Sequence, residues 1–483
     1  MSELATAADQ ETAPASPGER LRAYLGALPT EAKALLASEF ERARMRGEDL
    51  PGGEMVLALL RTDLREAADP DDPEEPAARS EQAARLLFRP LEPFLIDERL
   101  EAKTRGRIMR DSVQAIWTWV RRDLKPAETK VFEAAVLAAS AADDAEAVNY
   151  HCAKFVSVMI PAIEAKLGAT EGGEPARKRL AAHLGDERVL DDAVDIIRVL
   201  PDIGALVHLP ARLPAHIKNF ADEGLDNARQ LLDPIALRRP SLLPFALALV
   251  QTRLVHRYQI VRLAVAAAES DDPAKIASHP YRHAVELVLA DAERALLAAA
   301  AALKVNRPQL VAAAVKEFHD AARALRTDMN LAGDGPWQRR LARMRGTLAR
   351  QLSAEIDGVP GQIRRLLRAP QRDDVTHEPI SPEAVADVEN RLDLLTVCRN
   401  SASEIALNEI TVRVFGEIQG YLDPRLTQLL EAIRSAPDVD RALKIAQIDA
   451  GIRFSARIFG ASYAQLLQKA ADVAIQSGRN PGR

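Results

Sequence analysis

The chain has few aromatic residues and few cysteines, and these shortages limit the folds it can adopt. Aromatic side chains make up only 4% of its 483 residues, while hydrophobic residues as a group make up 47%. Cores built mainly from Ala, Leu, Val and Ile suit closely packed helices better than a sandwich or a propeller. The two cysteines, Cys152 and Cys398, form no CxxC or CxxH pair. The sequence therefore predicts no zinc framework and no disulfide scaffold, and both thiols are expected to be buried fillers.

A long uncharged apolar run is also missing. Pro244 interrupts the stretch 241–251, and the alanine-rich run 295–305 is too short to span a bilayer. The stretch 1–20 has no basic start followed by an apolar segment, so it does not look like a secretory signal. These features predict a cytoplasmic protein.

The chain lacks the strong basic excess that is typical of general nucleic-acid binders, since its formal net charge is −6. The charge is unevenly distributed, however. Residues 1–80 carry 17 acids and 9 bases, whereas residues 335–372 carry 9 bases and 2 acids. An acidic N-terminal region and a basic region far along the chain therefore have nearly equal and opposite charge.

The motifs of several common enzyme classes are absent. The sequence contains no GxxxxGK[ST], GxGxxG, GxSxG or HExxH pattern. An ordinary P-loop, a dinucleotide-binding turn, a hydrolase nucleophile elbow and a zinc protease helix are therefore not predicted. We expect no cofactor, and the absence of an assembled catalytic set favours a protein without catalysis of its own.

Apolar residues recur at intervals of three and four through most of the chain, which is the period of an amphipathic helix. The clearest start is at Ser381 and Pro382, which are typical of an N-cap and a first helical position. No alternating β-branched run indicates a strand. The predicted fold is all-α, with multi-domain helical bundles, a long C-terminal helical hairpin and little or no β-structure.

The length exceeds the ~250–300 residues at which single cores stop growing, so two or three domains are expected. Long helices are predicted near 97–124, from 381 to about 420, and without interruption from 439 to 475. The predicted segments are a disordered tail at 1–17, a small helical segment at 18–66, an acidic proline-rich linker at 67–80, a helical domain at 81–235, a helical domain with basic helices at 241–372, and a long-helix bundle at 381–478.

One acidic motif is the only match to a known catalytic pattern. Asp191, Asp192 and Asp195 form DDxxD, the pattern with which all-helical isoprenoid synthases hold magnesium against a diphosphate. Asp191 and Asp195 are one helical turn apart, and carboxylate oxygens suit Mg²⁺. The second acidic motif of those synthases is not found. Acids near the start of a helix also offset the helix dipole, which is the simpler interpretation.

The basic region begins with WQRRLARMRGTLARQL at 337–352, which carries five arginines and no acid. At 100° per residue, Trp337, Leu341, Met344, Leu348 and Leu352 form a narrow apolar seam. Arg339, Arg343 and Arg350 point away from the seam, while Arg340 and Arg345 flank it. The basic region continues with Arg364, Arg365 and Arg368 on a predicted second helix.

These arginines have several candidate partners. The face could be solvated, could pair with the chain's own acidic N-terminal region, or could dock an acidic partner protein, because the guanidinium fork binds carboxylates two oxygens at a time. A homo-oligomer and an anionic membrane surface are further candidates. Nucleic acid is the least favoured partner because the surrounding chain is acidic.

The sequence thus favours a non-catalytic cytoplasmic helical scaffold or protein-protein interaction protein. Its candidate partner-binding residues are Arg339, Arg343, Arg350, Arg364, Arg365 and Arg368. The alternatives are a Mg²⁺-dependent all-helical enzyme acting on a diphosphate through Asp191, Asp192 and Asp195, and a peripheral membrane protein that binds anionic lipid through 337–368.

Overall fold

The computed structural model describes residues 17–45, 52–67, 75–168, 173–368, 380–435 and 438–477. The chain divides into two compact units, and neither is a continuous segment. The first unit consists of residues 1–97, 106–218 and 237–255, and the second consists of 98–105, 219–236 and 256–483. The described residues are almost entirely helical, which confirms the predicted all-α class.

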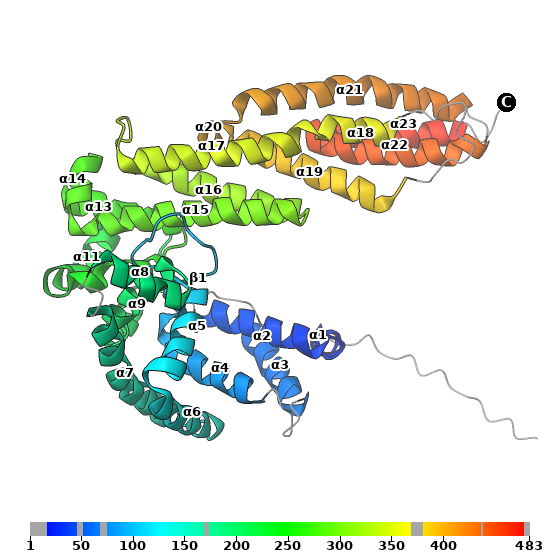
Figure 1. Ribbon diagram of the computed structural model, residues 1–483. Coiled ribbons are helices and arrows are strands. Elements are labelled where there is room, and N and C mark those ends of the chain that lie inside the picture. The colour runs from blue at the N-terminus through cyan, green and yellow to red at the C-terminus, as the bar shows by residue number, and fades with distance from the viewer. Residues whose placement is uncertain are drawn as a thin grey trace, which may run out of the picture. The chain divides into compact units, whose positions relative to one another are not determined.

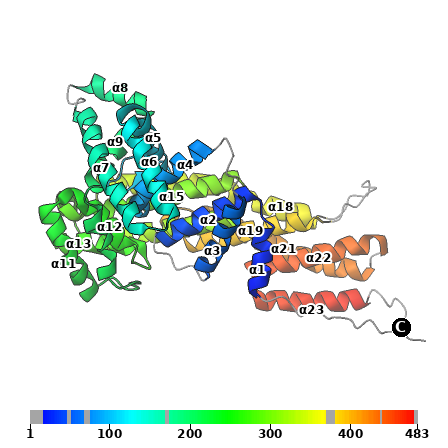
Figure 2. The ribbon, with the colours of Figure 1, turned by 90° about the horizontal axis from the view of Figure 1, so that it is seen from below.

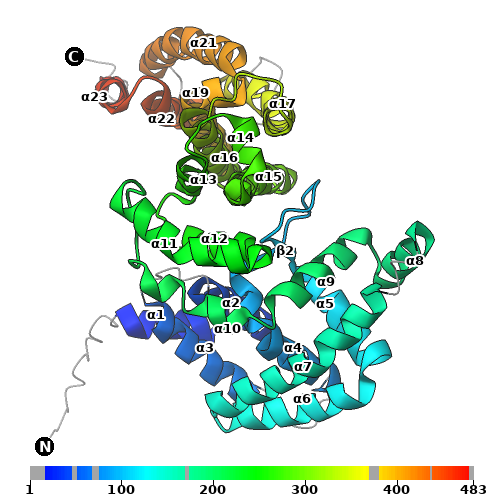
Figure 3. The same cartoon turned by 90° about the vertical axis from the view of Figure 1, so that its left-hand side faces the viewer.

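The first unit is built from helices and one very small sheet. Its elements are α1 (Pro17–Gly26), α2 (Thr30–Met45), α3 (Gly53–Ala67), α4 (Glu75–Phe88), η1 (Arg89–Phe94), β1 (Leu95–Ile96), β2 (Ile108–Met109), α5 (Arg110–Trp119), η2 (Val120–Leu124), α6 (Pro126–Ala141), α7 (Ala145–Gly168), α8 (Glu174–Leu184), α9 (Glu187–Val199), α10 (Ile203–Val207), η4 (Pro210–Arg212), η5 (Pro240–Leu242) and α12 (Leu243–Gln251). β1 and β2 pair in parallel, with Leu95 opposite Ile108. Figure 3 shows α6 and α7 side by side as a helical hairpin.

The core of the first unit combines the chain's few aromatic residues with one fully buried helix. Trp117 of α5 makes edge contacts with three phenylalanines, and its indole N–H donates to the Ser80 hydroxyl at 3.1 Å. Every residue of α12 is buried. That helix is the uncharged apolar stretch at 241–251 in the sequence, so its all-round burial follows from its lack of a polar face.

The second unit contains the remaining elements. They are α11 (Glu223–Arg238), η6 (Arg257–Ile260), α13 (Val261–Ala268), α14 (Pro273–Ser278), η7 (Pro280–Arg282), α15 (His283–Lys304), α16 (Pro308–Asp328), α17 (Pro336–Asp357), α18 (Val359–Leu367), α19 (Pro382–Asn400), α20 (Ala402–Ile405), α21 (Asn408–Ser435), α22 (Asp438–Ile458) and α23 (Ala461–Ser477). Figures 1 and 2 show α19, α21 and α22 packed lengthwise as a bundle of long helices. The predicted N-cap is confirmed, because the Ser381 hydroxyl accepts from the Ala384 N–H at 3.3 Å.

Three predicted helices are shorter than the sequence pattern suggested. In the segment predicted as a helix at 97–124, residues 97–107 are irregular, 108–109 form β2, and a helix begins only at Arg110; Gly106, with φ +86°, disfavours the predicted helix. The helix from 381 ends at Asn400, and Ala406 then adopts a left-handed conformation with φ 55°. Gly460, with φ +95°, separates α22 from α23 where one uninterrupted helix was predicted.

The predicted segment boundaries near the N-terminus are only partly visible. Most of the tail at 1–17 and residues 68–74 of the acidic linker lie outside the described residues. α4 begins at Glu75, inside the stretch predicted as a linker. The predicted division at 235–241 is close to residue 236, where the chain passes from the second unit to the first.

Helix packing in the second unit requires a glycine where α22 meets α21. A Cβ atom at Gly451 would overlap Cδ2 of Leu426, which is itself fully buried. A Cβ atom added at Gly416 of α21 would have no neighbouring atom within 4 Å. The two helical glycines therefore differ in whether a side chain can be accommodated.

We expect Gly451→Ala to lower the free energy of unfolding by about 1–3 kcal/mol, because the fully buried Leu426 side chain must shift to accept the methyl group. Gly416→Ala should instead raise it by about 0.5–1 kcal/mol, since alanine restricts the unfolded chain and space is free. Urea titration of both variants measures the difference. A neutral Gly451→Ala would mean that the helix contact is looser than described.

Candidate docking surface

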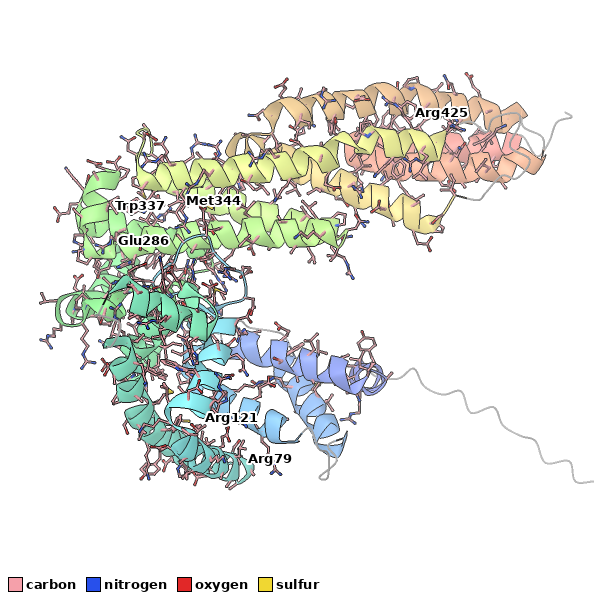
Figure 4. The ribbon with its side chains drawn as sticks, viewed as in Figure 1. Arg79, Arg121, Glu286, Trp337, Met344 and Arg425 are labelled. Carbon is pink, nitrogen blue, oxygen red and sulfur yellow. The ribbon has the colours of Figure 1, made fainter. Side chains whose placement is uncertain are left out.

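α17 begins directly after a turn that contains two glycines, Gly333 and Gly335. Gly335 is the N-cap and Pro336 the first helical residue, whose missing N–H needs no intrahelical acceptor. The predicted seam is confirmed, since its four aliphatic side chains are buried and Trp337 is half-buried. Figure 4 shows Trp337 and Met344 on the side of α17 that faces α15. Packing of the seam therefore fixes which arginines of α17 can point outward.

The two arginines that flank the seam are used by the fold. A terminal nitrogen of Arg340 lies 2.6 Å from a carboxylate oxygen of Glu293 on α15, and these side chains are only 15% and 7% exposed. Arg345 donates to the backbone carbonyl of Ser403 at 2.9 Å and also to that of Glu404, at the end of α20. Neither guanidinium is available to a partner without breaking these bonds.

The three outward arginines of α17 are exposed, as predicted, but their surroundings differ. Arg339 turns back to the preceding loop, where it donates to the carbonyl of Asp334 at 2.7 Å. Arg343 forms a long pair of 3.7 Å with Glu101, and both side chains are about two-thirds exposed, at 65% and 69%. Arg350 donates only to the Thr347 hydroxyl of its own helix, at 3.2 Å.

α18 continues the basic surface. Arg364 pairs with Glu417 of α21 at 2.5 Å and lies over the Tyr421 ring, with 5.7 Å to the centroid. Arg365 and Arg368 are exposed. Within the described part of the chain, no carboxylate lies within ion-pairing distance of Arg350, Arg365 or Arg368. We call these three residues the open arginines.

Acids close to the open arginines already have cationic partners. Asp357 pairs with Arg413 at 2.6 Å, and Glu355 pairs with Arg391. The C-terminal end of α18 is held from other helices, because the buried Gln447 amide donates to the carbonyl of Arg368 at 2.6 Å and Arg425 donates to that of Leu367 at 2.6 Å. Hydrogen bonds from two other helices thus fix the end of α18 that carries Arg365 and precedes Arg368.

Segment 98–105 contributes two acids that pair with arginines of α15 and α17. The sequence alone did not predict these pairs. Glu98 pairs with Arg294 at 2.8 Å, and Glu101 pairs with Arg343. The predicted pairing of the basic region with the acidic N-terminal region stays a prediction, since residues 1–16, 46–51 and 68–74 lie outside the described residues. Glu98 and Glu101 lie in a stretch that the sequence pattern predicted to be helical. Nothing in the sequence distinguishes them from other surface acids.

The three aspartates of the DDxxD motif have different environments. Asp191 is half-exposed and pairs with Arg177 at 2.7 Å. Asp192 and Asp195 are 1% and 3% exposed, and Asp192 accepts from the Met109 N–H at 3.1 Å. Across the described ranges, no group of three or more His, Cys, Asp or Glu side chains is arranged to hold a metal ion. The magnesium interpretation therefore gains no support and stays a prediction.

The start of α9, the helix that carries these aspartates, is set by an ordinary N-cap. Asp186 is the N-cap of α9, and its carboxylate accepts from the Arg188 N–H at 2.8 Å. His279 is likewise a cap, accepting from the Tyr281 N–H at 3.3 Å ahead of Pro280. These polar residues serve local structure.

A surface hollow of about 360 Å³ lies between α5 and α8 in the first unit. Its lining includes His183, whose Nε2 lies 3.0 Å from a carboxylate oxygen of Asp123 in the π-helical turn η2. Arg122 also donates to Asp123 through two nitrogens. Arg122 and His183 are therefore both already bound to an internal carboxylate, which leaves little attraction for an added anion.

Comparisons of the chain with protein-family models, with curated proteins and with solved structures found no match. Within the described residues, no helix combines the length and the apolar character needed to cross a membrane. The functional argument therefore depends on the surface chemistry of the chain itself.

We expect Asp192→Ala to lower the free energy of unfolding by about 1–3 kcal/mol, because it removes a buried carboxylate and leaves the Met109 N–H without its acceptor. Asp191→Ala is the matched control, and it should have little effect because a half-exposed ion pair contributes about 0–1 kcal/mol. Added Mg²⁺ should leave the Tm unchanged. A Mg²⁺-dependent rise in Tm that disappears in Asp191→Ala would instead support the metal interpretation.

Both thiols should react slowly in the folded protein. Burial raises the pKa of the Cys152 thiol to about 11 and that of Cys398 to about 12. Because only the thiolate attacks, alkylation near pH 8 should be about two orders of magnitude slower than that of a free thiol, and Cys398 should be the slower of the two. Mass spectrometry of iodoacetamide-treated protein measures both rates, with urea-unfolded protein as the reference. Fast native labelling of Cys152 would contradict this prediction.

Proposed function

We propose that this chain is a non-catalytic interaction protein that docks an acidic partner protein on α17 and α18. The observation that carries the proposal is the set of open arginines, which are exposed on two adjoining helices without an acid of the described chain to neutralise them. Their side chains project from elements fixed by buried seams, so the charges are held in place.

Arginine favours a carboxylate-bearing partner. Its planar guanidinium donates two parallel hydrogen bonds to one carboxylate, which gives direction as well as attraction. Among the described residues, Asp357, Glu355 and Glu417 already pair with Arg413, Arg391 and Arg364, so these three acids do not compete strongly for the open arginines. An incoming acidic segment therefore meets a surface with residual positive charge.

The same helices offer little to an apolar ligand. Within 336–368, all of which the structure describes, no large apolar side chain is exposed. The residues between the outward arginines are mostly small, such as Ala342, Gly346 and Ala354. Membrane insertion needs exposed apolar side chains beside the basic ones, so an acidic protein is the better-supported partner.

The test compares the full-length chain with two charge-reversal variants in pull-downs from extract of the source cell. The first variant is Arg350→Glu, Arg365→Glu and Arg368→Glu. The matched control is Arg179→Glu, Arg212→Glu and Arg238→Glu, which changes three exposed arginines outside α17 and α18 by the same charge. Each captured protein is then purified and titrated against all three chains.

We expect an acidic protein whose affinity falls at least about tenfold in the first variant and is unchanged in the control, because each attraction becomes a repulsion. Binding should also weaken as salt is raised, because exposed charges are screened. Equal affinities for all three chains would remove α17 and α18 as the docking surface. Capture of vesicles rich in anionic lipid, or of DNA, without any acidic protein would replace the proposal with another partner class.

A further inference from the structure

The second unit already holds one acidic segment beside its basic helix. Glu98 pairs with Arg294 of α15 at 2.8 Å. The Glu101 N–H donates to the Glu293 carboxylate, and that carboxylate also receives Arg340 of α17. Segment 98–105 has no regular secondary structure, so its acids reach α15 and α17 from an irregular chain.

The residues of this segment differ in how firmly they are held. Leu100 and Thr104 are buried, each with 3% of its surface exposed. The Glu98–Arg294 pair is mostly shielded, with side chains 26% and 29% exposed. The Glu101–Arg343 pair is long and largely solvated. Arg343 is therefore the arginine that the internal segment holds least firmly.

The open arginines extend the same helix face beyond the internal segment. Arg350 follows Arg343 by two turns, or about 10.5 Å along α17, and both point away from the seam. Arg365 follows on α18, and Arg368 is the residue directly after that helix. Segment 98–105 thus reaches Arg343, whereas Arg350, Arg365 and Arg368 have no acid of the described residues within ion-pairing distance.

We propose that the partner binds through an irregular acidic segment of the same kind as 98–105, and that it competes with Glu101 for Arg343. This inference rests on the proposed docking function and names the kind of segment that the surface takes. Its carboxylates are separated by a few residues, as Glu98 and Glu101 are. Binding at Arg350, Arg365 and Arg368 brings a further carboxylate of the partner to Arg343, where the internal pair is easily exchanged.

The test uses a labelled poly-glutamate peptide and the full-length chain, with fluorescence anisotropy as the readout. Glu101→Gln removes the competing carboxylate and keeps the backbone N–H that binds Glu293. Glu164→Gln, an exposed acid of α7, makes the same change of net charge elsewhere. Arg343→Gln, alone and combined with Glu101→Gln, removes the contested cation.

We expect Glu101→Gln to bind the peptide about two- to fivefold more tightly than the unaltered chain, which corresponds to the strength of one exposed ion pair. Glu164→Gln should leave the affinity unchanged, and the gain should vanish in the Arg343→Gln background. Circular dichroism of each variant confirms that the helices are retained.

The outcomes separate this inference from the docking proposal. Equal affinities for Glu101→Gln and Glu164→Gln, with binding still lost in the triple variant of the open arginines, would overturn the competition and leave the docking surface intact. A gain that persists without Arg343 would also overturn the competition, because it would be a general charge effect. No peptide binding to any chain would overturn both proposals.

Discussion

Close packing of helices over small side chains is the constraint on which the rest of this structure depends. Six alanines of α15 are buried, and α15 and α16 pack against each other along their length. At Gly451 the approach of α22 to α21 leaves no room even for a methyl group. Since little side-chain volume separates the helices, long charged side chains are excluded from most interfaces and accumulate on outer faces.

Two buried glutamates of the second unit are paired with arginines. Glu389 of α19 is 7% exposed and receives both Arg453 and Arg457 of α22. Glu293 plays the same role for Arg340. Removing one member of such a pair is costly, because the other charge is left buried and uncompensated. These arginines therefore belong to the fold, and only the remaining ones can serve a partner.

This division leaves α17 with two kinds of arginine along its length. Its first turns contact α15 and segment 98–105, while Arg350, like Arg365 and Arg368 farther along the chain, has no carboxylate of the described residues within ion-pairing distance. Exposed charges without an apolar centre favour fast, salt-sensitive association over tight binding, because steering acts at a distance and little area is desolvated. A partner that needs frequent exchange would suit such a surface.

The sequence by itself determined the all-α class, the buried seam of α17 and the outward direction of Arg339, Arg343 and Arg350, because helical periodicity is a local property. It did not place the helix end at Ala406, because alanine gives no local signal for a left-handed conformation, whereas Gly460 is a residue type that commonly ends helices. Nor could it show that the DDxxD carboxylates have separate environments. Only the tertiary structure decided which arginines are neutralised, since Glu293 and Glu101 reach α17 from segments distant in the chain. An ion pair depends on proximity in space, and sequence spacing gives that proximity only within one helix.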